Sequence, residues 1–195
     1  MSLAPRLATQ ADIKVLAKTF AAAFVDDPMI RWPMPPEFDL EACEHFFAVL
    51  VGDYIDLGVI WVLEDGLASA AWLDPDATAK FGEYDLKTRE LINPMTEDNG
   101  ERYGKFWDWL GAHIGDDPCW FLDMLAVHPS RQRQGLGGAL LRHGLALAAR
   151  DGLPAILETS QHANVAYYQG YGFELVDEGT SPDGGPRIWF MQKLA

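Results

Sequence analysis

The sequence predicts an α/β fold with a mixed central sheet flanked by helices, and two observations support this prediction. Apolar runs at residues 120–127 and 155–159 enclose an alanine- and leucine-rich segment at 136–150 that is typical of a helix. Two strands joined by a helix lie parallel in one sheet, as neighbours or nearly so. The dipeptide Asp65-Gly66 stands between two further apolar runs, which predicts an antiparallel hairpin. A sheet that contains both kinds of pair is mixed.

The N-terminal half is expected to supply a short strand, helices and the hairpin. Thr9 or Asp12 is a candidate cap for the first helix, and Asp26-Asp27-Pro28 is expected to end it. In chain order, we expect a strand at 3–7, a helix through Ile13, Leu16, Phe20 and Phe24, a helix at 40–55, hairpin strands at 59–63 and 67–73, and mostly helix at 75–114.

The C-terminal half alternates strands and helices before it ends in two strands joined by the turn-rich residues 181–186. In chain order, we expect a strand at 120–127, a helix at 136–150, a strand at 155–159, a helix at 163–169, and strands at 173–177 and 187–191. No repeat or linker divides the sequence. Residues 1–195 are therefore expected to form a single domain, which suits their length.

Composition narrows the classes of partner. The net charge is −14, from 15 basic and 29 acidic residues, so nucleic acid should be repelled and a cationic substrate attracted, although solubility alone also explains such a charge. We find no signal peptide and no run of about 18 apolar residues that would span a membrane. The two cysteines, Cys43 and Cys119, favour a reducing, cytoplasmic location over a disulfide framework. The oligomeric state stays open, and a homodimer is compatible with the sequence.

One segment is cationic within this anionic chain. Residues 124–150 contain no Asp or Glu, and they carry Arg131, Arg133, Arg142 and Arg150. Within them, a glycine-rich turn follows the strand that ends near Val127 and opens the helix at 136–150. Helix N-termini offer unpaired N–H groups and a positive dipole end, and glycines let phosphate oxygens approach the backbone. The segment therefore predicts a pyrophosphate site.

Two nucleotide-binding motifs fit this segment poorly. Gly135 and Gly137 match the first two glycines of a dinucleotide-binding fingerprint, but Leu140 occupies the position of the third. A P-loop would require a Gly-Lys-Ser/Thr sequence, which does not follow. An ordinary glycine-rich turn between a strand and a helix is the remaining alternative.

Two motifs together resemble a known superfamily. Val127-x-Pro129 followed by Gln132-x-x-Gly135-x-Gly137 resembles the coenzyme A pyrophosphate loop of the GNAT N-acetyltransferases. About thirty residues later, the segment from Asn164 to Phe173, with Tyr168 and Gly172-Phe173, is similar to their second signature. The resemblance implies the GNAT acyl-CoA N-acyltransferase fold, acetyl-CoA as the cofactor, and an N-acetyltransferase domain over residues 1–195.

Further segments are similar to the puromycin N-acetyltransferase-like branch of that superfamily. They are Arg6–Thr9 with Asp12, Phe20–Phe24, Trp61-Val62, Ala71-Trp72, Trp120–Leu122 and Leu157–Ser160. The chain departs from that branch at Tyr167, where the branch tends to carry Phe, and at Gly170-Tyr171. These departures lie near the acceptor side, so puromycin itself is not implied.

The resemblance also implies which residues bind the cofactor. Backbone groups of Leu125 and Val127 would pair with the pantetheine arm, as an added strand pairs with a sheet edge, and Asn164 would contact the arm near the thioester. The expected cofactor-binding residues are Leu125, Ala126, Val127, Gln132, Arg133, Gln134, Gly135, Leu136, Gly137, Gly138, Asn164 and Tyr168. No histidine or cysteine pair has zinc-like spacing, so no metal is expected.

Three residues are candidates for proton transfer. Tyr168 matches the family position of the general acid, because a departing thiolate needs a proton and a phenol can give it; the alternative is a core tyrosine. An acceptor amine arrives as ammonium, so a base is also needed. Asp123 is an unexpected charge inside an apolar strand, and Glu158 lies near the end of the next strand. Either of these could instead bind the ammonium or pair with an arginine.

The sequence therefore predicts an acetyl-CoA-dependent N-acetyltransferase. The acceptor is expected to be a small-molecule, cationic primary amine that attacks the thioester directly. Two alternatives stay open. One is a non-catalytic acyl-CoA-binding or sensing domain, and the other is a protein or peptide N-acetyltransferase.

Overall fold

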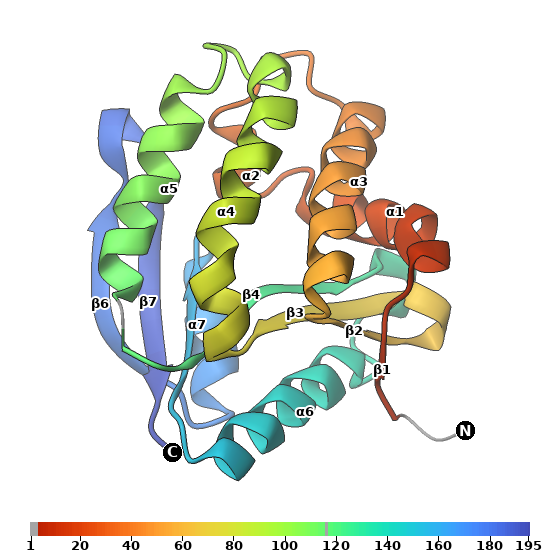
Figure 1. Ribbon diagram of the computed structural model, residues 1–195, viewed down its shortest axis with the longest axis vertical. Coiled ribbons are helices and arrows are strands. Elements are labelled where there is room, and N and C mark those ends of the chain that lie inside the picture. The colour runs from red at the N-terminus through yellow and green to blue at the C-terminus, as the bar shows by residue number, and fades with distance from the viewer. Residues whose placement is uncertain (1–3, 116) are drawn as a thin grey trace.

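A computed structural model describes residues 4–115 and 117–195, with the backbone alone at 81–87. Its described residues form a seven-stranded mixed sheet in the order β1-β2-β3-β4-β5-β7-β6 (Figure 1). The strands are β1 (Arg6–Leu7), β2 (Ile60–Leu63), β3 (Ala68–Leu73), β4 (Trp120–Val127), β5 (Ala155–Thr159), β6 (Glu174–Thr180) and β7 (Arg187–Lys193). Only β4 and β5 pair in parallel among these, and the other neighbours are antiparallel.

Helices cover both faces of the sheet. They are α1 (Ile13–Phe24), α2 (Pro28–Arg31), α3 (Leu40–Leu57), α4 (Pro75–Ile92), α5 (Glu101–Ile114), α6 (Leu136–Asp151) and α7 (His162–Gln169). Helices α6 and α7 share one apolar core with the sheet, and α1 and α3 share the other. Figure 1 shows α6 separated by the sheet from α1, α3 and α4. No described helix is both long enough and apolar enough to cross a membrane.

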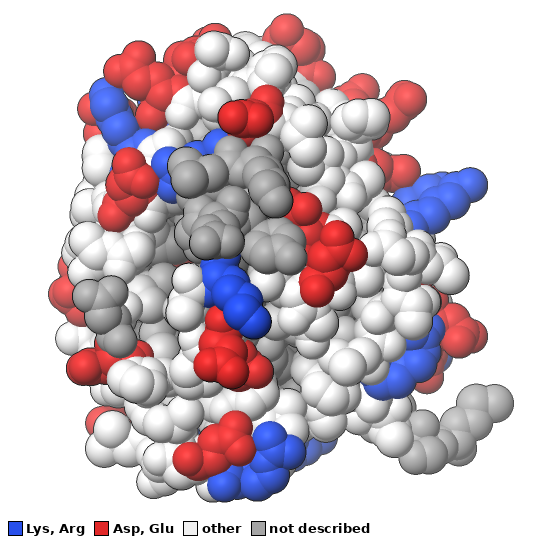
Figure 2. Space-filling model, viewed as in Figure 1, with Lys and Arg blue, Asp and Glu red and all other residues white. Residues whose placement is uncertain are grey.

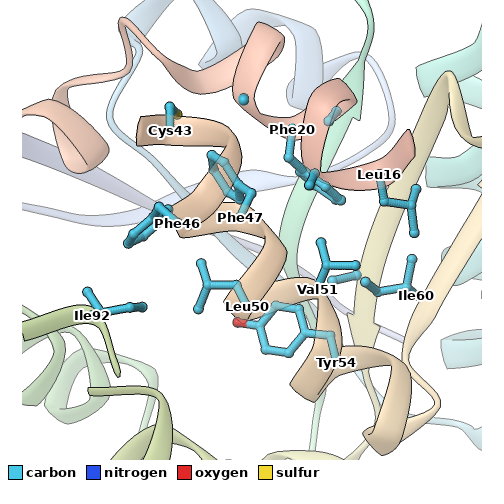
Figure 3. Close-up of a cluster of buried hydrophobic side chains, with 14 of the residues drawn as sticks. Leu16, Phe20, Cys43, Phe46, Phe47, Leu50, Val51, Tyr54, Ile60 and Ile92 are labelled. Atoms are coloured by element: carbon cyan, nitrogen blue, oxygen red, sulfur yellow. The ribbon is translucent and has the colours of Figure 1, made fainter. Parts of the chain in front are cut away.

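The larger core lies between α1, α3 and the strands. Phe20 of α1 and Phe46 and Phe47 of α3 are fully buried there (Figure 3). Tyr54 lies further along α3. The rings of Phe20 and Phe47 lie 5.5 Å apart, and those of Phe46 and Phe47 lie 5.1 Å apart edge to face. Such pairs stabilise a core beyond the apolar area that they bury. This core therefore gives α3 a fixed position over the sheet.

Most expected elements are confirmed, with shifted ends. The strands at 120–127 and 155–159 have the predicted bounds, and they are parallel neighbours. The first strand is shorter than expected, and the last two strands extend to Thr180 and Lys193. Thr9 and Asp12 form a capping box on the 3₁₀ turn Gln10–Asp12 that leads into α1, in which the Asp12 carboxylate accepts a hydrogen bond of 2.8 Å from the Thr9 N–H. Helix α1 ends at Phe24, just before Asp26-Asp27-Pro28 as expected, but the sequence analysis did not predict the short α2 that begins at Pro28.

Candidate active site

The two parallel strands separate at the centre of the sheet. Their register runs from Trp120–Ala155 to Leu122–Leu157, and beyond that point β5 pairs only with β7 among the described strands. Strand β4 continues to Val127 along β3. The edge of β4 after Leu122 therefore faces a gap in the sheet, and backbone groups along such an edge can pair with an added strand-like ligand.

A β-bulge places Asp123 beside this gap. In the register of β4 with β3, Leu122 pairs with Trp72 and Met124 pairs with Ala71, so Asp123 is the extra residue. Bulges change the direction of a side chain and are common next to active sites. Asp123 and Met124 both face the α3 side of the sheet, although neighbouring residues of a regular strand would face opposite sides.

Tyr54 holds the Asp123 carboxylate. Its hydroxyl group donates a hydrogen bond of 2.8 Å to Oδ2 of Asp123. Burial raises the pKa of the Tyr54 phenol, and the neighbouring Asp123 charge raises it further, so Tyr54 remains a donor. The sequence analysis did not identify Tyr54, because nothing in the pattern of α3 distinguishes it from other apolar positions.

Glu158 is buried at the end of β5. Burial raises its pKa well above the ordinary value, and the nearby charges of Asp123 and Asp27 raise it further. Its Oε2 atom is buried and has no hydrogen-bond partner among the described residues. A buried carboxylate without a partner is costly, and a ligand that supplies a proton or a positive charge would relieve that cost.

Asp27 is a third carboxylate that the sequence analysis did not assign to the site. It caps α2, where its Oδ1 accepts a hydrogen bond of 2.9 Å from the N–H of Met29. The Ser160 hydroxyl donates to the same carboxylate at 2.9 and 3.0 Å. Burial raises the pKa of Asp27. The Asp27-Pro28 pair was the available signal, since Asp at an N-cap followed by Pro marks the start of a helix.

Tyr168 and Asn164 reach the same gap from α7. Tyr168 is 8% exposed and packs against the rings of Tyr167 and Phe173. Burial raises its pKa, so the phenol keeps its proton at neutral pH. Asn164 donates a hydrogen bond of 3.2 Å to the hydroxyl group of Thr159, which fixes its side chain at the end of β5.

These groups line one cavity of about 100 Å³. The cavity brings together five residues that the sequence analysis selected, which are Asp123, Leu125, Glu158, Asn164 and Tyr168. It adds Asp27, Tyr54 and Ser160, together with a wall of apolar side chains from α1, α3 and α5. A concave, mostly apolar space with a few convergent polar groups is the usual form of a small-molecule site.

The predicted pyrophosphate loop lies at the start of α6. Gly135 adopts the left-handed conformation (φ 83°) and immediately precedes the helix, and a side chain there would meet no described atom within 4 Å. At Gly137, an added Cβ would lie 3.3 Å from the Tyr167 hydroxyl. The loop is thus open above Gly135 and narrow at Gly137. Together with the N–H groups of the first turn, this shape fits a diphosphate.

Other expected cofactor-binding residues present mainly backbone groups. Ala126, Leu136 and Gly138 are buried, and Gly138 has no side chain. A Cβ on Gly138 would come within 2.2 Å of the Tyr171 hydroxyl, which explains why glycine is needed there. The Gln132 side chain donates to the carbonyl of Val127 at 3.2 Å and holds the loop against the end of β4.

The arginines of the cationic segment differ in their partners. Arg131 forms an ion pair with Glu64, and Arg150 pairs with Asp151 at 3.0 Å. Arg142 lies 5.9 Å above the ring of Tyr171, and the exposed Arg133 makes no ion pair with any described residue. Arg133 and Arg142 are therefore the charges of this segment that remain for a bound anion.

Acidic residues predominate on the surface. On the face shown in Figure 2, Asp and Glu side chains are spread over several regions, and Lys and Arg side chains are fewer. This agrees with the net charge of −14. A field of this sign would attract a cationic acceptor by long-range electrostatics.

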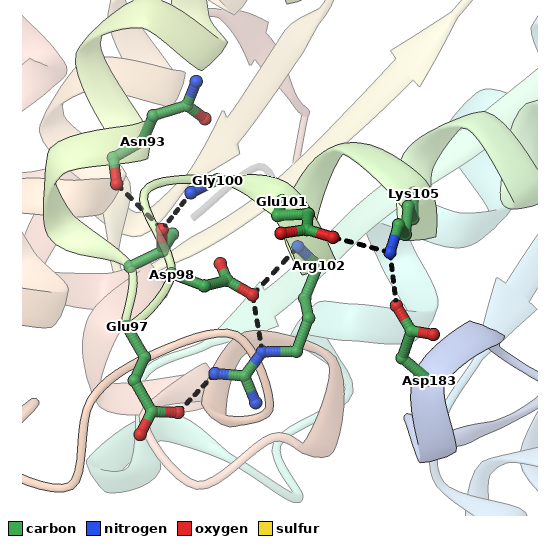
Figure 4. Close-up of polar contacts among 9 residues, drawn as sticks. Asn93, Glu97, Asp98, Gly100, Glu101, Arg102, Lys105 and Asp183 are labelled. Carbon is green, nitrogen blue, oxygen red and sulfur yellow. Dashed lines mark hydrogen bonds and ion pairs between the residues drawn. The ribbon is translucent and has the colours of Figure 1, made fainter.

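Ion pairs hold α5 beside the cavity. Lys105 contacts Glu101 at 2.8 Å and Asp183 of the loop between β6 and β7 at 3.0 Å (Figure 4). Arg102 contacts Asp98 at 2.8 Å and also pairs with Glu97. Individual exposed pairs stabilise little, but several at one helix end restrict its orientation. Helix α5 is thereby linked to the β6–β7 hairpin.

Comparisons with known proteins agree with this geometry. The Acetyltransferase (GNAT) family profile matches residues 24–173. An acetyltransferase of Stachybotrys chartarum is 28% identical, over 97% of this chain and 88% of its own length.

Solved structures share the fold. A Corynebacterium glutamicum protein described as histone acetyltransferase HPA2 and related acetyltransferase has a TM-score of 0.68 at 22% identity, covering 98% of this chain and 96% of its own. The Drosophila melanogaster polyamine N-acetyltransferase has a TM-score of 0.67 at 13% identity, covering 98% and 99%. The seven-stranded sheet, the gap between β4 and β5, and the profile match show that this chain belongs to the GNAT family of acetyltransferases.

Proposed function

We propose that this protein is a single-domain N-acetyltransferase that transfers the acetyl group of acetyl-CoA to a small, cationic primary amine. The observation that carries the proposal is the convergence of Asp123, Glu158 and Tyr168 on one cavity at the gap between β4 and β5. A base and an acid on opposite sides of a reacting carbonyl are what direct aminolysis of a thioester requires.

Acetyl-CoA supplies the thioester carbonyl and the sulfur leaving group. Backbone groups of β4 from Leu125 to Val127 bind its pantetheine arm, and residues 132–138 bind its diphosphate through the first turn of α6. Arg133 is placed to add a charge to that contact. Asn164, held by Thr159, orients the arm beside Tyr168.

The carboxylates receive and deprotonate the amine. An ammonium ion near Glu158 and Asp123 favours their ionised forms, which offsets the cost of burial. Glu158 then takes a proton from the nitrogen, because its Oε2 is not engaged by another described residue. Asp123, held by Tyr54, binds the ammonium and is the alternative base.

Tyr168 completes the transfer. The neutral nitrogen forms a bond to the carbonyl carbon, the carbon–sulfur bond breaks, and the phenol of Tyr168 gives its proton to the departing sulfur. The raised pKa of Tyr168 keeps this proton in place until the sulfur needs it. The nitrogen then loses its second proton, which passes through solvent to the Tyr168 phenolate, and Glu158 releases to solvent the proton that it took.

The alternatives are less well supported. A sensing domain would need the loop at the start of α6, but not three carboxylates gathered at the reacting position. A protein acetyltransferase would need an open groove for a peptide, whereas the cavity here is small. The resemblance to the puromycin N-acetyltransferase-like branch also favours a small-molecule acceptor. Free thiols at the buried Cys43 and Cys119 are in keeping with a reducing, cytoplasmic location.

The test is a transfer assay with acetyl-CoA. Primary amines and lysine-containing peptides would be offered at equal concentration, and mass spectrometry would identify the acetylated product. We expect N-acetylation of amines. Binding of acetyl-CoA without transfer to any acceptor would support the sensing domain instead, and preferential labelling of peptides would support the protein acetyltransferase.

A further inference from the structure

The cavity has two chemically different sides. The carboxylates come from the sheet and from the turn that Ser160 holds against it. The opposite wall comes from α1, α3 and α5, and it is mostly aromatic. Its aromatic lining residues are Phe24, Phe46, Phe47, Tyr54, Tyr103, Phe106 and Trp107.

The aromatic wall is continuous. The rings of Phe24 and Phe47 are 5.7 Å apart, and the ring of Phe46 is 6.5 Å from that of Tyr103. On α5, the rings of Phe106 and Tyr103 lie 5.4 and 6.0 Å from that of Trp107. Figure 3 shows Phe46 and Phe47 on the same helix as Tyr54, whose hydroxyl contacts Asp123. The wall therefore extends from α1 through α3 to α5 and meets the acids at Tyr54.

The volume of the cavity is of the order needed for one ring. Its volume is about 100 Å³, of the same order as the ~150 Å³ apolar cavity that binds benzene in an engineered protein. Aromatic rings pack favourably against other rings in edge-to-face and offset arrangements at these separations. A ring enclosed by such walls packs against more of their surface than a thin alkyl chain does.

The distribution of charge argues against a polyamine. Every carboxylate among the described lining residues belongs to the acidic side, which consists of Asp27, Asp123 and Glu158. A long polyamine with one ammonium at the acids would place another against the aromatic wall. Removing that second ion from water is costly, and a cation–π interaction offsets only part of the cost.

We infer that the acceptor is an arylalkylamine: a single primary ammonium on a short chain, carried by one aromatic ring that packs against the wall from α1, α3 and α5. This inference rests on the proposed function, because it assigns the acceptor of the same cavity. Asp27, Asp123 and Glu158 face the ammonium, and Phe106 and its neighbours face the ring.

A matched amine series tests the inference. The substrates are 2-phenylethylamine, 2-cyclohexylethylamine, butylamine and spermidine, and the readout is kcat/KM from thiol release with acetyl-CoA. We expect 2-phenylethylamine to exceed butylamine and spermidine at least tenfold, and to exceed its cyclohexyl analogue by a smaller factor. Spermidine or butylamine as the best substrate would overturn the inference while the proposed function survives. Acetyl-CoA binding without acetylation of any amine would overturn the proposed function itself.

A pair of variants assigns the preference to the cavity wall. Phe106→Leu removes a ring that lines the cavity, whereas Phe190→Leu removes a buried ring of the same small cluster that does not line it. We expect Phe106→Leu to lower the ratio of kcat/KM for 2-phenylethylamine over butylamine about three- to tenfold. Phe190→Leu should leave that ratio unchanged. Equal ratios in the two variants would contradict the assignment, and because each ratio is internal to one variant, it does not depend on the folded fraction.

Discussion

The hydroxyl group of Tyr54 on α3 donates a hydrogen bond of 2.8 Å to Oδ2 of Asp123, the bulged residue of β4. This hydrogen bond joins α3, which supplies part of the aromatic wall, to β4, which carries the Asp123 carboxylate. It also directs the carboxylate toward the cavity that both residues line. In the proposed mechanism Tyr54 is a positioning residue, because it acts through Asp123.

Tyr54→Phe should weaken both folding and turnover. Removing the donor leaves a partly buried carboxylate without this hydrogen bond, which costs about 1–3 kcal/mol of unfolding free energy. We expect kcat to fall several-fold, with acetyl-CoA affinity unchanged. A double-mutant cycle with Asp123→Asn in urea denaturation measures the coupling, and strictly additive effects of the two substitutions would show that the hydrogen bond is not energetically significant.

Tyr168→Phe should lower kcat by about 10²–10⁴-fold without loss of acetyl-CoA binding, because it removes only the proton donor. The raised pKa of Tyr168 means that the phenol stays protonated below pH 10, so its contribution is lost only at higher pH. Tyr167→Phe is the control, since Tyr167 is its neighbour on α7 and is 40% exposed. Equal kcat values for wild type and Tyr168→Phe would make Tyr168 a packing residue.

Gly137→Asp should reduce coenzyme A affinity at least tenfold, because it places a carboxylate at the diphosphate and each hydrogen bond to a charged group contributes about 1.5–3 kcal/mol. Gly137→Ala should cost less, since its Cβ meets only the movable Tyr167 hydroxyl and a methyl group of Val127. Gly111→Asp is the charge-matched control on α5, where a Cβ would meet no described atom within 4 Å. Calorimetry that gives one Kd for all three variants would refute the loop assignment.

Glu158→Gln should raise the free energy of unfolding by an amount that grows with pH. The pKa of Glu158 is raised in the folded protein, so the folded state binds this proton more tightly than the unfolded chain does. Glu158 is protonated in both states at pH 3.5, and it destabilises the fold progressively as the pH rises above its unfolded value near ~4.3 toward its folded value. We therefore expect the variant to have a higher Tm than wild type at pH 8, with the difference shrinking toward zero as the pH falls to 3.5.

The same variant tests catalysis. If catalysis needs ionised Glu158, the plot of kcat against pH should rise with pH above 4.5. Glu158→Gln should remove this rise and most of kcat. Asp27→Asn is the control, because the pKa of Asp27 is also raised and this carboxylate accepts hydrogen bonds from Met29 and Ser160. A pH profile that persists in Glu158→Gln and disappears in Asp123→Asn would make Asp123 the base.

The sequence predicted those elements whose apolar pattern and length are visible in one continuous segment of the chain. The runs at 120–127 and 155–159 are continuous and apolar because both strands are central in the sheet, so their bounds were readable. The four-residue α2 was missed, because a single turn has no periodicity and depends on its Asp27 cap. The end of β6 was placed too early because this edge strand is largely exposed and shows no apolar pattern, and the end of β7 was placed too early because its last residues, Gln192 and Lys193, are polar.

The candidate site was also predicted only in part, because some of its residues show no signal in their own segment of the sequence. Asp123, Glu158, Asn164 and Tyr168 were found from motifs and from charge in apolar runs, and the structure gathers all of them in one cavity. Asp27 and Tyr54 come from segments distant in the sequence, and only tertiary packing brings them to β4 and β5. The bulge that turns Asp123 toward α3 likewise depends on the pairing of β4 with β3.

A crystal structure with coenzyme A and an N-acetylated amine tests the central claim most directly, which is that the gap between β4 and β5 is where acetyl transfer occurs. We predict the coenzyme A sulfur within hydrogen-bond distance of the Tyr168 hydroxyl, and the amide nitrogen of the product beside Glu158 or Asp123. The diphosphate should contact the first turn of α6 at Gly135 and Gly137. Coenzyme A bound away from this gap, or a product outside the cavity, would contradict the account.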